Sequence, residues 1–164
     1  GKLRNFYWGI ALMPLVALPF IGSGGRGWRG RIFRSLIVTV PLAAALHETL
    51  GVMGWLGIQL DLASCVITSI GIGVGEDFAI HLLHYFDRKG SFEGAASENA
   101  ELLTYGLLTA VGFASFAFSG FLPLRQFAGL VIVILALSYL NAMLLVPLGV
   151  RAADKLEKLV KKNG

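Results

Sequence analysis

Long apolar stretches dominate this chain, and each is about as long as a helix that crosses a membrane. Five such stretches occur, at residues 5–22, 35–57, 62–86, 102–122 and 127–150. About 20 helical residues span the roughly 30 Å hydrocarbon layer of a bilayer. Lipid leaves no backbone N–H or C=O group unpaired, and no alternating strand pattern occurs, so these stretches predict helices. We therefore expect an all-α membrane protein with a five-helix transmembrane bundle.

The composition argues against a soluble protein. Of the 164 residues, 55% are apolar and 15% are charged, whereas about a quarter of an average soluble domain is charged. Cys65 is the one cysteine, which excludes a disulfide framework. The net charge of +4 does not indicate a nucleic-acid partner, because the charges lie in the loops and the tail, as they do in membrane proteins.

The basic residues predict the orientation of the chain. Eleven of the fourteen lie on one side of the predicted membrane, in the loop after residue 22, in the loop after residue 86 and in the tail. The positive-inside rule makes that side cytoplasmic, so five crossings put the N-terminus outside and the C-terminus inside. The first stretch carries Pro14 and Pro19 and could instead be kinked or re-entrant. Residues 151–164 are expected to form an amphipathic basic helix on the inner membrane surface.

Ionisable residues inside the apolar stretches are the strongest indication of function. His47 and Glu48 fall near the middle of the second stretch, and Glu76 and Asp77 fall near the middle of the third. Each such group costs about 2.5–3.5 kcal/mol at the centre of a membrane helix. One interpretation is a functional site. The other is a neutral carboxylic acid that only bonds a neighbouring helix.

Asp77 is followed by two histidines at helical spacing. His81 and His84 come four and seven residues later, so all three share one face of a helix. A carboxyl group within the membrane, followed by titratable groups, is what a proton path requires. Glu76 points about 100° away from Asp77. The histidines could instead lie at the membrane interface, and the spacing matches no standard metal-ligand set, so no metal and no cofactor are expected.

Small residues before the acids predict close helix packing. Gly71, Gly73 and Gly75 lie within one apolar stretch. Gly71 and Gly75 are four residues apart, a spacing that lets a second helix approach closely. Thr109, on the fourth stretch, is a candidate hydroxyl that could relay protons to Asp77.

These residues carry a resemblance to a known family of transporters. Gly71–His84 (GIGVGEDFAIHLLH) resembles the fourth transmembrane helix of the resistance-nodulation-division (RND) superfamily, in its MMPL-like and Patched-like exporter branch. Leu50–Asp61 is similar to the end of the third helix of that family, and Leu107–Phe127 to the fifth helix and the following turn. The resemblance covers roughly residues 33–148. Glu76, His47 and Glu48 depart from the pattern of the family.

The resemblance implies one membrane half of a proton-motive-force-driven exporter of lipids, drugs or other amphiphiles, corresponding to helices two to six of one repeat. Asp77 would be the proton-coupling group, and Glu76, His81, Glu48 and Thr109 are further candidates. The implied partners are membrane lipid, the substrate, and a second repeat or further copies of the chain. A bacterial inner membrane is the implied location. The alternative is a lipid-binding module similar to a sterol-sensing domain. No catalytic set indicates an enzyme.

Overall fold

Four helices and one short 3-10 turn make up the described part of the chain. The computed structural model describes residues 28–58, 62–89 and 95–163. The helices are α2 (Trp28–Trp55), α3 (Leu62–Lys89), α4 (Ala95–Ala114) and α5 (Leu122–Asn163), with η1 (Ser115–Phe118) after α4. No strand occurs in these ranges, so the described part of the chain is all-α. The predicted first span, 5–22, lies outside the described residues.

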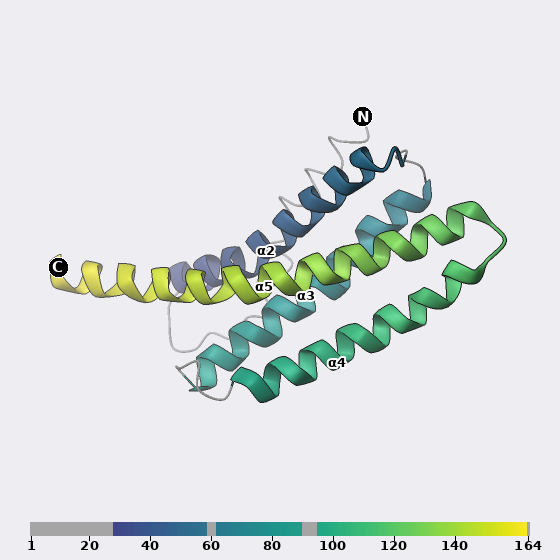
Figure 1. Cartoon of the computed structure of the whole chain (residues 1–164). Helices are drawn as coiled ribbons and strands as arrows, with labels where there is room; N and C mark the ends of the chain where they lie inside the picture. The colour runs from purple at the N-terminus through teal and green to yellow at the C-terminus, as the bar shows by residue number, and fades with distance from the viewer. Residues whose placement is uncertain (1–27, 59–61, 90–94, 164) are drawn as a thin grey trace.

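Helices that follow one another in the sequence run in opposite directions, and α5 lies at the centre of the bundle (Figure 1). It packs against α2, α3, α4 and η1, and α2 and α3 also pack against each other. α4 touches α5, η1 and part of α3 but does not contact α2. The start of α2 and the ends of α3 and α5 lie at the same end of the bundle (Figure 1).

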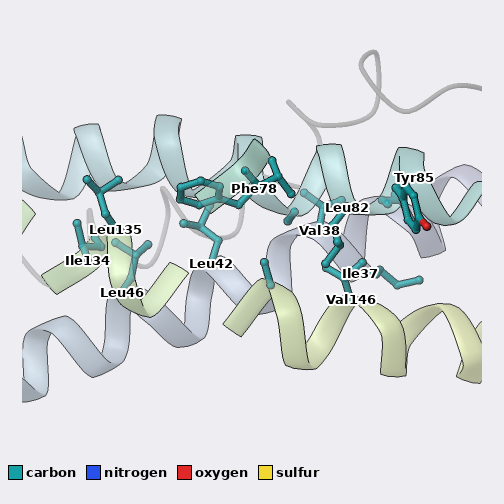
Figure 2. Close-up of a cluster of buried hydrophobic side chains, with 14 of the residues drawn as sticks. Ile37, Val38, Leu42, Leu46, Phe78, Leu82, Tyr85, Ile134, Leu135 and Val146 are labelled. Atoms are coloured by element: carbon teal, nitrogen blue, oxygen red, sulfur yellow. The ribbon is translucent and has the colours of Figure 1, made fainter. Parts of the chain in front are cut away.

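The apolar core lies between α2, α3 and α5. Side chains from the three helices interdigitate there (Figure 2). Phe78 of α3 packs edge-on against Tyr139 of α5, with ring centroids 5.9 Å apart. This arrangement is a favourable one for aromatic pairs. The buried cluster includes Val38, Leu42, Leu46, Leu82, Tyr85, Ile134 and Val146.

Two glycines allow α3 to approach α5 closely. A Cβ atom added at Gly71 would overlap Cδ1 of Ile134. A Cβ atom added at Gly75 would lie 2.7 Å from Oγ of Ser138 and 2.8 Å from Cδ1 of Leu42 in α2. Gly73, the third predicted packing glycine, is exposed and has nothing within 4 Å of an added Cβ atom. The expectation for Gly73 is therefore wrong within this bundle, because two residues along a helix turn the side chain by about 200°.

Three of the helices are long and apolar enough to cross a membrane: Ile32–Trp55, Ala100–Phe118 and Leu122–Ala153. Their outward surfaces carry large apolar side chains that water would disfavour. On α4 these include Tyr105, Leu108 and Val111, and Phe118 of η1 is 91% exposed. The predicted spans 35–57 and 127–150 lie largely within α2 and α5, and 62–86 lies within α3, which is not one of these three helices. The predicted span 102–122 covers the end of α4, η1 and the turn before α5.

The C-terminal tail is helical and continues α5, while its position on the membrane surface stays a prediction. α5 continues without a break through Pro147 to Asn163. The residues after Gly149 are mostly Ala, Leu, Lys and Glu, all strong helix formers, so the backbone has no local reason to stop. The tail is therefore the end of α5 rather than a separate helix.

Replacing Gly75 by alanine is expected to destabilise the bundle, because the new methyl group would crowd Ser138 and Leu42. Overpacking costs about 1–3 kcal/mol. Gly73→Ala is the matched control and should be neutral or stabilising, since alanine favours helices by up to about 1 kcal/mol over glycine. Thermal unfolding of both variants in detergent measures the difference. Equal melting temperatures would contradict the close α3–α5 contact.

Candidate functional site

Asp77 and His81 lie on the side of α3 that points away from the rest of the described bundle. Both side chains are exposed, as is Gly73 one turn before Asp77. We call Gly73, Asp77 and His81 the α3 polar stripe. The orientation follows from helix geometry, because Gly71 and Gly75 turn the opposite side of α3 toward α5.

Glu76 and His84 occupy the edges of this stripe. Glu76 is half-buried, and it comes directly after Gly75, where α3 packs closely against both α2 and α5. His84 is also half-buried, one turn beyond His81 toward the end of α3. Asp77, His81 and His84 follow one another along α3 toward the end of the bundle where α5 ends (Figure 1), and Arg151 and Lys155 belong to the last third of α5.

Thr109 does not reach Asp77 in this structure. Its Oγ1 donates a hydrogen bond of 2.9 Å to the carbonyl of Tyr105, one turn earlier in α4. A hydroxyl has one proton to donate, so Thr109 has none left for Asp77. The structure therefore shows no hydrogen bond from Thr109 to Asp77, and the relay stays a prediction. The sequence supplies a hydroxyl of the right type, but bonding within its own helix is the common outcome for threonine.

A hydrogen bond between two side chains joins α2 to α5. Nδ2 of Asn141 donates a hydrogen bond of 2.8 Å to Oε2 of Glu48. Next to it, Nδ1 of His47 bonds to the carbonyl of Ala43 at 2.7 Å, within α2. Glu48 thus belongs to an interhelical contact on α2 and α5, and Asp77 has no part in that hydrogen bond.

Asn141 is the residue that reasoning from the sequence missed. It is a polar amide within a long apolar stretch. In such a position a polar side chain needs a partner, and an acid on a neighbouring helix is a suitable one. The sequence therefore indicates that Asn141 needs a polar partner. It does not identify Glu48 as that partner, because the pairing depends on how α2 and α5 align.

Ser138 is the buried polar group without a partner in the described structure. Its side chain is 2% exposed, and Oγ has no hydrogen bond. By contrast, the hydroxyls of Thr39 and Thr49 donate to carbonyls of their own helix. An unpaired buried hydroxyl costs about 1–3 kcal/mol. Ser138 therefore makes the α3–α5 contact near Gly75 less favourable than an apolar contact of the same shape.

Within the described residues, no three histidine, cysteine, aspartate or glutamate side chains come together as metal ligands. Asp77, His81 and His84 follow one face of α3 but do not converge. What the arrangement offers is a carboxyl group and two imidazoles in a line along α3.

The fold and its apolar surface define a multi-pass membrane protein. The chain is similar to a protein of Methanocaldococcus jannaschii named "Putative membrane protein MJ1562", with 35% identity over 105 residues. The match covers 58% of this chain and 26% of that protein, so the chain spans about a quarter of the length of this relative. No family model matches the chain. No solved structure matches it significantly.

The Glu48–Asn141 contact is expected to contribute directly to stability. A double-mutant cycle of Glu48→Leu and Asn141→Leu should give a coupling energy of about 0.5–2 kcal/mol, the usual range for hydrogen bonds between membrane helices. Unfolding of the four proteins in mixed detergent measures it. The matched cycle of Ser35→Ala with Asn141→Leu should be additive, because Ser35 bonds Ile32 of its own helix. A coupling near zero for Glu48 and Asn141 would show that the contact does not form.

Proposed function

We propose that this chain is the membrane half of an exporter driven by the proton-motive force, with Asp77 as the proton-coupling group. The observation that carries the proposal is the α3 polar stripe. It places a carboxylate on the outer side of a helix whose opposite side is packed tightly by Gly71 and Gly75. Membrane proteins rarely keep an ionisable group at such a position without a partner or a function.

The physical basis of coupling is the cost of charge inside the membrane. An ionised Asp77 favours an arrangement in which water or a cation reaches it, whereas a protonated Asp77 tolerates an apolar neighbour. Each protonation state therefore favours a different packing of α3, and a proton gradient shifts the population between the two. His81 and His84 lead from Asp77 toward the basic end of the bundle and are suited to pass protons on. Glu76 and Glu48 are secondary candidates for proton binding.

The proposal needs a partner for the α3 polar stripe. Among the described residues, none lies within 4 Å of a Cβ atom added at Gly73, so another helix can approach there closely. Transporters of this kind move one repeat against another. The relative in Methanocaldococcus jannaschii is about four times as long as the matched part, which leaves room for a second repeat in one polypeptide. A second copy of this chain is the other candidate. The exported compounds would be lipids or other amphiphiles.

A lipid-binding module without transport is the second candidate function. It is favoured by the apolar outer face of α4, whose large side chains face away from the other described helices. A module of this kind resembles a sterol-sensing domain and needs no proton path. Saturable lipid binding that is the same in the wild type and in Asp77→Asn, without any export, would favour this function.

Asp77→Asn is expected to abolish proton-coupled export and to leave membrane insertion intact, because asparagine keeps the size of the side chain but cannot ionise. The measurement is efflux of the fluorescent amphiphile Nile red, driven by a pH gradient, from vesicles that contain the full-length protein. Glu101→Gln removes an exposed acid on α4 and should leave efflux unchanged. Full efflux in Asp77→Asn would rule out the coupling role.

The C-terminal end of α5 is expected to face the cytoplasm of a bacterial inner membrane, because the basic residues gather there. In a Cys65→Ala background, Arg125→Cys should react with an impermeant maleimide from outside intact cells. Lys155→Cys should react only after the membrane is permeabilised. Both sites are exposed in the structure. The opposite labelling pattern would reverse the orientation.

A further inference from the structure

The carboxyl group of Glu48 can accept more hydrogen bonds than it receives in the structure. Oε2 accepts one hydrogen bond from Asn141, and the side chain is exposed on the outer surface of the bundle. A carboxylate can accept about four hydrogen bonds. Among the described residues no other donor and no cationic side chain reaches Glu48. The Lys and Arg side chains described on α2 and α5 each lie ten or more residues along the helix from Glu48 or Asn141: Arg34, Arg125, Arg151 and Lys155.

Glu48 lies well inside the apolar part of α2. The candidate span runs from Ile32 to Trp55, so Glu48 is seven residues, or about 10 Å, from its nearer end. Asn141 likewise lies inside the candidate span of α5, Leu122–Ala153. At this depth the solvent supplies no counter-charge, and an ionised carboxyl group needs one from a molecule in the membrane.

Apolar side chains surround this polar pair on the same sides of the two helices. Trp55 follows Glu48 by seven residues, and Leu144 and Leu148 follow Asn141 by three and seven. These spacings place all three on the faces of α2 and α5 that carry the pair. All three are exposed large apolar residues. The surface therefore combines the carboxyl group of Glu48 with exposed apolar side chains on either side of it.

From this we propose that Glu48 and Asn141 form a membrane-facing site for the ammonium headgroup of an amphiphile, whose tail lies along Leu144 and Leu148. Asn141 fixes the carboxyl group and leaves its second oxygen open to the ligand. A divalent metal ion fits poorly, because one carboxylate and one amide are too few oxygen ligands. The site includes Glu48, which is a secondary candidate for proton binding under the proposed function, but it does not require Asp77 to carry protons.

The test places a tryptophan reporter beside the expected tail. Trp8→Phe, Trp28→Phe and Trp55→Phe remove the three tryptophans of the chain, and Leu148→Trp introduces one at residue 148. The protein, in phosphatidylcholine vesicles, is titrated with 12-bromododecylamine, which is cationic at neutral pH and carries its quenching bromine at the end of the tail. The uncharged 12-bromododecan-1-ol is the comparison ligand. The amine should quench this tryptophan saturably, whereas the alcohol should show only the linear quenching of partition into lipid.

Matched variants identify the group responsible. Glu48→Gln keeps an acceptor for Asn141 and removes the charge, so the half-saturating amine concentration should rise about tenfold. Asn141→Leu should also weaken binding, because the carboxyl group loses the donor that orients it. Glu101→Gln removes an equal charge elsewhere and should leave the titration unchanged. Asp77→Asn should leave it unchanged as well, which separates this site from the proton-coupling role.

Three results would overturn the proposal. The first is unsaturable quenching by the amine, as expected if another protein segment or a second copy covers Glu48. The second is saturable binding of the alcohol with the same strength as the amine. The third is an equal loss in Glu48→Gln and Glu101→Gln, which would indicate a general effect of net charge. Loss of export in Asp77→Asn with intact amine binding would support both proposals independently.

Discussion

The close contact of α3 with α5 at Gly71 and Gly75 determines how the remaining polar groups are placed. Neither glycine leaves room for a Cβ atom, so this side of α3 must face Ile134 and Ser138. Helix geometry then directs Asp77 to the opposite side. The same contact brings the Phe78 ring against Tyr139. One pair of small residues thus fixes both the apolar core and the outward direction of the α3 polar stripe.

Much of the fold could be predicted from the sequence, because membrane-length apolar stretches leave helices as the remaining choice. The packing role of Gly71 and Gly75 followed from their four-residue spacing. Gly73 could not be assigned in the same way, because only one side of α3 touches α5. The continuation of α5 past residue 150 was missed for a different reason. A change from apolar to charged composition marks where a span leaves the lipid, but it does not end a helix.

The polar residues could be placed from the sequence within one helix, but their contacts between helices could not. The exposed side of α3 could be proposed from residues 77 to 84, since they belong to one helix. The contact between Glu48 and Asn141 depends instead on the alignment of two helices that are far apart in the sequence. That alignment is fixed by packing such as Ile37 against Gly149, where an added Cβ atom would lie 2.9 Å from the isoleucine. No pattern within a single helix contains this information.

The contacts of α5 differ on its two sides, and the difference bears on which helix can move. α2 is held to α5 by the tight packing of Ile37 on Gly149 and by the hydrogen bond of Glu48. α3 packs just as closely on α5, through Ile134 at Gly71 and Phe78 at Tyr139, but the unpaired hydroxyl of Ser138 adds no hydrogen bond there. Apolar packing can be exchanged for other apolar contacts, whereas moving α2 would break a hydrogen bond. Under the proposed function, α2 and α5 therefore form the fixed frame, and α3, which carries Asp77, is the helix that responds to protonation.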